Sequence, residues 1–180
     1  MMWIIIGVVL FVLIIVIIYN SLVRLKNQVE NSWAQIDVQL KRRTDLIPNL
    51  IESVKGYMKH EKETLAEVTK ARTAFLNAGS VKEKAKASNM MTDTLKSLFA
   101  VAESYPNLKA NENFLQLQEE LSGTENKIAY ARQNYNDMVM LFNTKIEQIP
   151  YSIFASMMRY GRKDLFEIQE SERKNVKVSF

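Results

Sequence analysis

MMWIIIGVVLFVLIIVIIY, residues 1–19, is the stretch that decides the fold of this chain. It contains no charged side chain, and as a helix it would extend roughly 28 Å at 1.5 Å per residue, close to the thickness of a bilayer's hydrocarbon core. A backbone in hydrocarbon must satisfy its own hydrogen bonds, and a single span does so only as a helix. Trp3 and Tyr19 stand at the two ends, where amphipathic rings favour the membrane interface. The stretch therefore predicts a transmembrane anchor.

Two alternatives for residues 1–19 are a buried core helix and a cleaved signal peptide. A core helix so uniformly apolar is unusual in a small domain. A signal peptide carries a basic region before its apolar stretch and small residues at its cleavage site. Here nothing basic precedes Trp3, and the stretch ends in Ile17-Ile18-Tyr19-Asn20. The flanks therefore favour an anchor that is retained.

The composition beyond the anchor is helical. The 180 residues include only 5 Gly and 3 Pro, and Ala, Leu, Lys, Glu, Gln, Asn and Met dominate the later part of the chain. The absence of Cys excludes disulfides and thiolate chemistry, and a single His excludes a His-rich metal site. The formal net charge of +4 permits attraction to anionic lipid, but no dense basic block indicates nucleic-acid binding. We therefore expect no nucleic-acid partner.

Apolar residues recur at helical spacing from Asn20 onward, with no Gly or Pro between this segment and the anchor. This pattern predicts one helix that continues out of the bilayer. Pro48 interrupts it, because proline cannot donate to the carbonyl four residues back. Either the helix kinks there, or Thr44 or Asp45 caps a new helix. The apolar stripe resumes in phase, which favours a kink in a near-continuous rod that ends at residues 77–79.

Local signals place the later helices. Ser80-Val81-Lys82-Glu83 fits a capping box, and the helix that it starts ends at Tyr105-Pro106-Asn107. Asn111 is the expected cap of a long helix that runs to Ile149-Pro150. Gly123 lies inside this helix, where it is a cost that close packing or a local bend would justify.

A short amphipathic helix at residues 151–161 and a mobile tail at residues 164–180 complete the chain. Long helices with short connections pack antiparallel. The sequence therefore predicts an all-α fold, in which the N-terminal transmembrane helix (residues 1–19) continues into an elongated antiparallel helical bundle (residues 20–163).

The cluster Lys41-Arg42-Arg43-x-Asp45 is the strongest candidate for a polar site. Two guanidinium groups beside a carboxylate could clamp an anion or a phosphate. The alternative, which we favour, is a salt-bridged polar layer that fixes the register of the bundle, or a basic collar at the membrane. Residues spaced by seven and four on a later helix share one face and could meet this cluster. The candidate network or anion site therefore comprises Arg42, Arg43, Asp45, Glu125, Arg132 and Asn136.

Metal and catalytic signals are weak. His60 lies near Glu61, Glu63 and Glu67, but one His and exposed acids lack the ligand count of a zinc site, and no His-Glu-x-x-His occurs. No Gly-rich phosphate loop or nucleophile elbow is present. We expect a protein that is not an enzyme, with no cofactor and no metal.

The short helix at residues 151–161 carries a further candidate surface. Its apolar residues recur at one, three and four positions, which gathers them on one stripe, and Arg162-Lys163 follow. An apolar stripe edged with cations suits an anionic bilayer interface. The alternative, which we favour, is that the stripe closes one end of the bundle. The candidate membrane or partner contact comprises Ile153, Phe154, Met157 and Met158.

Several blocks resemble the LemA family. They are KRRTDLIPNL at 41–50, VKGY at 54–57 and GTENKIAYAR at 123–132, with the Tyr-Asn pair at 19–20 and FNT at 142–144. The resemblance covers nearly the whole chain. It implies a bacterial, membrane-anchored helical-bundle protein without an agreed biochemical activity. Family genes often neighbour a membrane metalloprotease of the heat-shock type, and one relative takes part in magnetosome membrane formation.

One departure concerns the side of the membrane. Many relatives carry a lipobox cysteine just before the Tyr-Asn pair, where this chain has Ile17-Ile18. Sidedness is therefore not inherited from those relatives. Arg24, Lys26 and Lys41-Arg42-Arg43 follow the anchor and no Lys or Arg precedes it, which favours a cytoplasmic bundle. We expect a single-pass protein of the bacterial inner membrane.

These inferences together predict a non-enzymatic membrane-anchored scaffold or adaptor that organises bacterial envelope proteins or lipids. Its expected partners are the lipid bilayer, other membrane proteins such as a membrane protease, and a second copy of the chain. The alternative is a ligand- or lipid-binding sensor that uses the Arg42–Asp45 region. A hydrolase is a third and weaker alternative.

Overall fold

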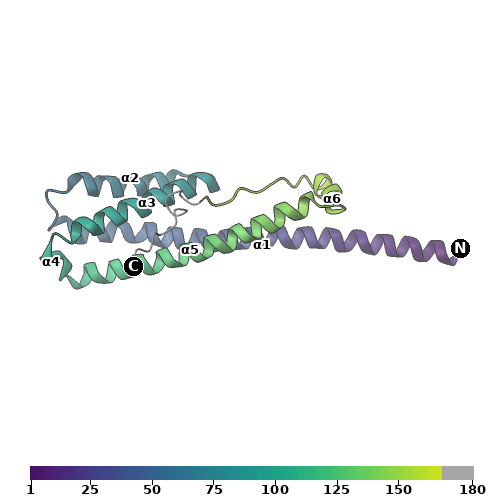
Figure 1. The fold of residues 1–180 in the computed structure, drawn as a ribbon, viewed down its shortest axis with the longest axis horizontal. Coiled ribbons are helices and arrows are strands. Elements are labelled where there is room, and N and C mark those ends of the chain that lie inside the picture. Colours follow the sequence, from purple (N-terminus) through teal and green to yellow (C-terminus); the bar gives the residue numbers. More distant parts are fainter. Residues whose placement is uncertain (168–180) are drawn as a thin grey trace, which may run out of the picture. The chain divides into compact units, whose positions relative to one another are not determined.

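The computed structural model describes residues 1–167, which form six helices and no strand (Figure 1). The predicted all-α fold class, with a long apolar N-terminal helix followed by further helices, is confirmed. In chain order the helices are α1 (Met2–Lys55), α2 (Lys62–Asn77), α3 (Val81–Ala102), α4 (Pro106–Lys109), α5 (Glu112–Glu147) and α6 (Tyr151–Met157).

The chain divides into two compact units that both contain parts of α1 and α5. One unit combines residues 1–35 with residues 131–165, and the other combines residues 36–130 with Phe166 and Glu167. Each unit has its own buried apolar residues and its own polar contacts, so each is described separately.

The unit built on residues 36–130 is a four-helix bundle of α1, α2, α3 and the first part of α5. Lys84 on α3 pairs with Asp37 on α1, and the rings of Phe99 on α3 and Phe114 on α5 meet edge to face at 6.1 Å. α2 and α3 pack side by side. The apolar stripe that the sequence predicted lies inside this bundle, with Ile36, Leu40, Ile47, Leu50, Val54, Val68, Met91, Leu98 and Leu121 buried.

The predicted near-continuous rod to residues 77–79 is wrong, because the chain reverses between α1 and α2. α1 passes through Pro48 and ends at Lys55. Gly56 follows, and a glycine loses more conformational entropy in a helix than other residues do. The oxygen of Val54 accepts from the backbone nitrogens of both Tyr57 (3.0 Å) and Met58 (2.9 Å), which closes the last turn. The Met58 side chain is fully buried and holds the reversal against the bundle.

Both predicted caps are confirmed. Ser80 Oγ accepts from the backbone nitrogen of Glu83 at 3.2 Å, and Glu83 Oε2 accepts from the backbone nitrogens of Gly79 (2.8 Å) and Ser80 (3.1 Å). These bonds hold the pKa of the Glu83 carboxyl below its ordinary range. Asn111 Oδ1 accepts from the backbone nitrogen of Phe114 at 3.1 Å. Thr44 and Asp45 cap nothing, because both lie inside α1.

The unit built on residues 1–35 and 131–165 pairs residues 18–35 of α1, which follow most of the apolar stretch, with the last part of α5 and with α6. The rings of Trp33 and Tyr135 lie 5.4 Å apart, and those of Phe142 and Tyr160 lie 5.9 Å apart. Asn143 binds the backbone of Lys163 twice, donating to its oxygen at 2.9 Å and accepting from its nitrogen at 2.8 Å. The segment after α6 is therefore fixed along α5.

α6 has the two turns that the sequence predicted, but it ends before the expected stop at Gly161. Its last residue is Met157, and Arg159 adopts a positive φ of 54°. The predicted mobile tail, residues 164–180, lies outside the described residues from 168 onward. Of its first residues, Phe166 is 1% exposed, and the oxygen of Asp164 accepts from the Tyr135 hydroxyl at 2.9 Å.

The N-terminal apolar stretch stands apart from any core. Only 6% of the apolar window in α1 is buried, and Trp3 is 80% exposed. In the described part of the chain, α1 is the one helix long and apolar enough to cross a membrane. A soluble core helix would bury such a surface, so its exposure here indicates a helix whose solvent is lipid.

Candidate functional site

Arg43 is a charged side chain in the middle of an apolar helix face. It lies on α1 between Leu40 and Ile47, which share its side of the helix at spacings of three and four. Its side chain is 1% exposed. Taking a guanidinium out of water is costly unless partners compensate for the lost hydration. The partners of Arg43 therefore decide what this residue does.

Three side chains from α3 and α5 supply those partners. Arg43 Nη2 donates to Oγ of Ser88 at 2.7 Å and to its backbone oxygen at 3.2 Å. Arg43 Nη1 donates to Thr92 Oγ1 at 3.0 Å and to Glu125 Oε2. Thr92 in turn donates to Glu125 Oε1 at 2.9 Å. We call Arg43, Ser88, Thr92 and Glu125 the arginine cluster.

The charges in the arginine cluster are unequally buried. Burial lowers the pKa of the Arg43 guanidinium, and the charge of Glu125 and its hydrogen bond oppose that shift. The carboxylate of Glu125 is 39% exposed, so it keeps contact with water while Arg43 does not. Arg43 Nε is buried without a hydrogen-bond partner. An arginine stays protonated in such surroundings, so the cluster holds an ion pair between α1 and α5, and the hydrogen bonds of Ser88 and Thr92 join α3 to it.

The structure brings together only two of the six residues predicted for the polar network, Arg43 and Glu125. Arg42 forms a separate pair with Glu120 at 3.8 Å on the surface. Asp45 is exposed and is not a partner of Arg43. The two residues are two positions apart on α1, which turns their side chains about 200° away from each other.

Arg132 and Asn136 belong to the other unit, where both are half-buried. Ser88 and Thr92 are the members that the sequence prediction missed. Both lie at core-facing positions of α3 beside Met91 and Leu95. Small polar residues in a predicted apolar stripe are the signal that would have found them.

A cavity of about 240 Å³ adjoins the arginine cluster. Thr92 and Glu125 form part of its wall, together with Lys96, Gln118 and Asn126. Arg43 itself does not line it. The cluster is therefore reached from solvent through Thr92 and Glu125, on the side where α3 and α5 face each other.

The second predicted surface is divided between two sides of α6. Ile153 is 58% exposed and Met157 is 76% exposed, whereas Phe154 and Met158 are half-buried. Ala155, which the prediction did not single out, is buried. The outward pair lies four residues apart and remains a candidate contact surface.

Within residues 1–167 no three His, Cys, Asp or Glu side chains are grouped as a metal site would need. Near His60, the Glu61 carboxylate accepts from the Tyr105 hydroxyl at 3.0 Å, a contact that joins the α1–α2 turn to the connection between α3 and α4. This hydrogen bond raises the pKa of Tyr105. The acid beside His60 therefore has a structural partner.

Comparison with known proteins places these features in a family. The family model described as the LemA family matches residues 32–180, which include the arginine cluster. The chain belongs to the LemA family. It is 30% identical over 161 residues to Protein LemA of Metamycoplasma hominis, an alignment that covers 89% of this chain and 74% of that protein.

More distant relatives of this LemA family chain carry a different name. Magnetosome proteins MamQ 1 and MamQ 2 of Paramagnetospirillum magneticum are each 20% identical to it over 189 residues, covering 91% of this chain and 70% of each relative. None of these names denotes a reaction. The match to the family model begins after the apolar stretch of α1. The evidence for an exposed apolar N-terminal helix therefore comes from this chain and not from the family match.

Proposed function

We propose that this LemA family chain is a non-enzymatic, membrane-anchored scaffold or adaptor that organises bacterial envelope proteins or lipids. One observation carries the proposal. Arg43, the one charged side chain that is buried among residues 1–167, directs both of its terminal nitrogens to groups of its own bundle. The arginine cluster therefore serves to hold the helices of this chain in register rather than to present a reactive group to solvent.

The anchor and the charges beside it support the proposed location. We propose a single pass through the bacterial inner membrane, with the bundle in the cytoplasm. Arg24 and Lys26 follow the apolar stretch, and positive residues next to a span are retained inside. Protease added to intact spheroplasts should leave the bundle undigested, while lysed spheroplasts should lose it. Digestion of the bundle in intact spheroplasts would place it outside.

A scaffold needs partners, and we propose other membrane proteins, such as a membrane protease, and a second copy of the chain. Native electrophoresis of membranes extracted with a mild detergent tests this. The chain should migrate in complexes larger than its 20.8 kDa monomer with bound detergent. The matched control is the chain without residues 1–19, which should leave those complexes. A chain that is monomeric in every native extract would contradict the scaffold.

The cavity beside Thr92 and Glu125 favours a second candidate function, a sensor for a small ligand. A ligand there would contact Glu125 and so reach the ion pair that joins α1 to α5. Thr92→Val removes a cluster hydroxyl and Asn126→Leu fills the cavity from its rim. If the protein is a sensor, the Asn126→Leu variant should no longer respond to the small ligand. If it is a scaffold, the same variant should form its protein complexes unchanged.

A further inference from the structure

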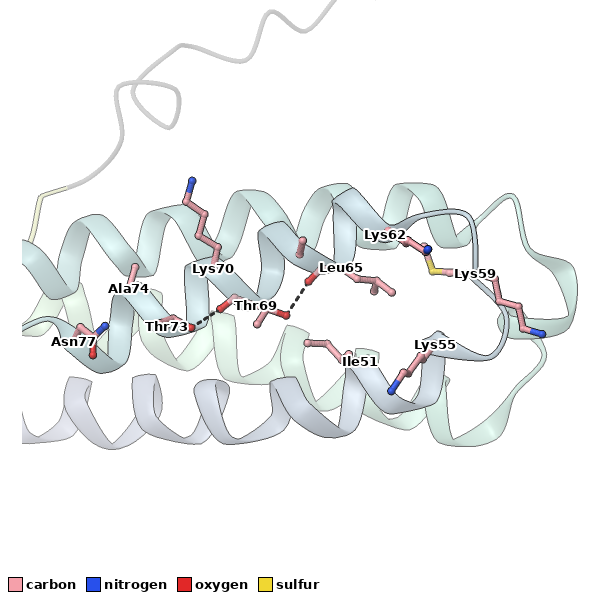
Figure 2. A pocket seen from close by; sticks show the side chains of 12 residues that line it. Ile51, Lys55, Lys59, Lys62, Leu65, Thr69, Lys70, Thr73, Ala74 and Asn77 are labelled. Carbon is pink, nitrogen blue, oxygen red and sulfur yellow. Dashed lines mark hydrogen bonds between the residues drawn. The ribbon is translucent and has the colours of Figure 1, made fainter.

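A groove runs between the end of α1 and the face of α2, and none of the four residues of the arginine cluster lines it (Figure 2). Its volume is about 990 Å³. Ile51 on α1 and Leu65 on α2 contribute its apolar surface, with Met58 buried below. This groove lies wholly within the unit of residues 36–130.

The groove follows one face of α2 from end to end. Its α2 residues fall at positions 62, 65, 66, 69, 70, 73, 74 and 77, which recur at three and four. α2 has 16 residues, so the strip is about 24 Å long. Two of these positions are Ala66 and Ala74, and small side chains let a second helix approach closely.

The two threonines in this strip present carbon rather than oxygen. Thr69 Oγ1 donates to the oxygen of Leu65 at 2.9 Å, and Thr73 Oγ1 donates to the oxygen of Thr69 at 2.9 Å (Figure 2). Both hydroxyl protons are therefore used within α2. The groove is more apolar than its sequence suggests, and its occupant must bring an apolar face.

The charge around the groove has a single sign. Lys55, Lys59, Lys62 and Lys70 line it, and no Asp or Glu is among its lining residues. Among residues 1–167, Lys55 is the one lysine of these four that forms an ion pair, an exposed one with Glu52 at 3.4 Å. An occupant that complements this rim must carry carboxylates beside its apolar face.

We infer that this groove binds an acidic amphipathic helix of a partner protein. The apolar face of that helix would contact Ile51 and Leu65, and its carboxylates would face the four lysines. An amphipathic helix laid into an apolar groove is a common mode of recognition. The inference rests on the proposed scaffold function and names the chemistry of its partner.

The distribution of the lysines favours a helix over a single fatty acid or lipid. Three of them, Lys55, Lys59 and Lys62, lie around the α1–α2 turn, and Lys70 lies two turns further along α2. One anionic headgroup would engage one end of this row. Carboxylates spaced along a helix would engage the lysines at both ends of the row.

Photocrosslinking from inside the groove tests the inference. A photoreactive residue replaces Thr69 in the full chain, the native membranes are illuminated, and mass spectrometry identifies the crosslinked segment. We expect a segment of another protein that has helical apolar spacing flanked by Asp and Glu. Adducts with lipid, adducts with the chain itself, a segment without acids, or no adduct would each overturn the inference.

A second photoreactive position separates this inference from the scaffold proposal. Met140 on α5 is 60% exposed and lies in the other unit. Protein adducts at Met140 without any at Thr69 would refute the groove while leaving a scaffold intact. An absence of protein adducts at both positions, together with monomeric native extracts, would refute both.

Charge reversal supplies the quantitative test. The probe is a synthetic peptide of the crosslinked segment, titrated against the full chain in nanodiscs of neutral lipid. Lys59→Glu with Lys62→Glu should weaken binding at least tenfold. The matched control, Lys109→Glu with Lys127→Glu, changes net charge equally at exposed positions outside the groove and should bind like the parent.

A groove-filling variant serves as a second test that does not depend on charge, in case the charge reversal affects folding. Ala66→Trp occupies the strip at an exposed position without changing charge and should also reduce binding at least tenfold. Binding of the peptide by both groove variants as tightly as by the parent would overturn the inference.

Discussion

Nε of Arg72 on α2 donates a hydrogen bond of 3.2 Å to the backbone oxygen of Thr44 on α1. In an uninterrupted helix that oxygen would accept from the backbone nitrogen of residue 48, but residue 48 is Pro and has no N–H. Arg72 supplies the missing donor from the neighbouring helix. The Pro48 of the LIPN segment is thus accommodated inside α1 by a side chain that comes from 28 residues beyond Thr44 in the chain.

This relationship predicts a measurable coupling between Arg72 and Pro48. Arg72→Met leaves the Thr44 oxygen without a donor and should cost about 1–3 kcal/mol of unfolding free energy. In a Pro48→Ala background the new backbone N–H satisfies that oxygen, so the same change should cost about 1 kcal/mol less. Urea denaturation of the full chain in detergent micelles measures all four proteins. Strictly additive effects would show that the bond does not compensate for Pro48.

The arginine cluster predicts that Glu125 matters more to stability than Asp45. Glu125→Ala leaves a guanidinium buried without its charge partner, which should cost about 2–4 kcal/mol after allowance for the exposure of Glu125. Asp45→Ala removes an exposed side chain and should change stability by less than about 0.5 kcal/mol.

The matched control for the cluster is the pair Arg43→Met with Glu125→Gln, which removes both charges. It should recover most of the stability that Glu125→Ala loses, because no unpaired charge remains. Equal unfolding midpoints for the Asp45 and Glu125 variants would contradict the assignment of the ion pair.

Gly123 lies at an exposed position inside α5, and a Cβ built there meets no atom within 4 Å. The close packing that the sequence analysis considered is therefore not the reason for this glycine. Gly123→Ala should raise the unfolding free energy by about 0.5–1 kcal/mol, because alanine loses less backbone entropy in a helix. A lower denaturation midpoint for Gly123→Ala than for the parent would indicate a bend or contact that requires glycine.

Tyr135 makes stability depend on pH in the alkaline range. Burial, and secondarily the charge of Asp164, raise the pKa of its phenol to about 12. A raised pKa means that the folded state favours the neutral phenol. The neutral phenol's contribution to the unfolding free energy is present in full below the unfolded-state pKa of about 10. That contribution is lost as the pH rises through the folded-state pKa of about 12.

The comparison with Tyr135→Phe isolates this group from other titrations. Between pH 8 and pH 11 the stability advantage of the parent over Tyr135→Phe should shrink by roughly 1–1.5 kcal/mol. Thermal unfolding in micelles at both pH values gives the difference. A gap that is constant or widens with pH would show that the phenol is not held neutral in the fold.

Features decided by neighbours in sequence could be predicted, and features decided by neighbours in space could not. The anchor follows from a run of apolar residues, and the caps at Ser80 and Asn111 follow from a side chain three residues away from its target. The end of α1 was missed because the apolar spacing continues through Gly56 into the turn, where Met58 is buried without being helical.

The arginine cluster was predicted only in part, because neighbours in space decide most of its contacts. Arg43 and Glu125 were marked by charge within recognisable motifs, but their contact is set by which faces of α1, α3 and α5 meet. Ser88 and Thr92 have no signal of their own beyond standing in an apolar stripe. Asp45 was included because it is close in sequence, although helix geometry turns it away.

Crosslinking followed by mass spectrometry, on the full chain in its native membrane, tests the central claim of a membrane-anchored scaffold most directly. We predict reproducible crosslinks from surface lysines of the bundle to a small set of other membrane proteins, which disappear when residues 1–19 are deleted. Crosslinks confined to the chain itself, or unchanged by removal of the anchor, would contradict the scaffold.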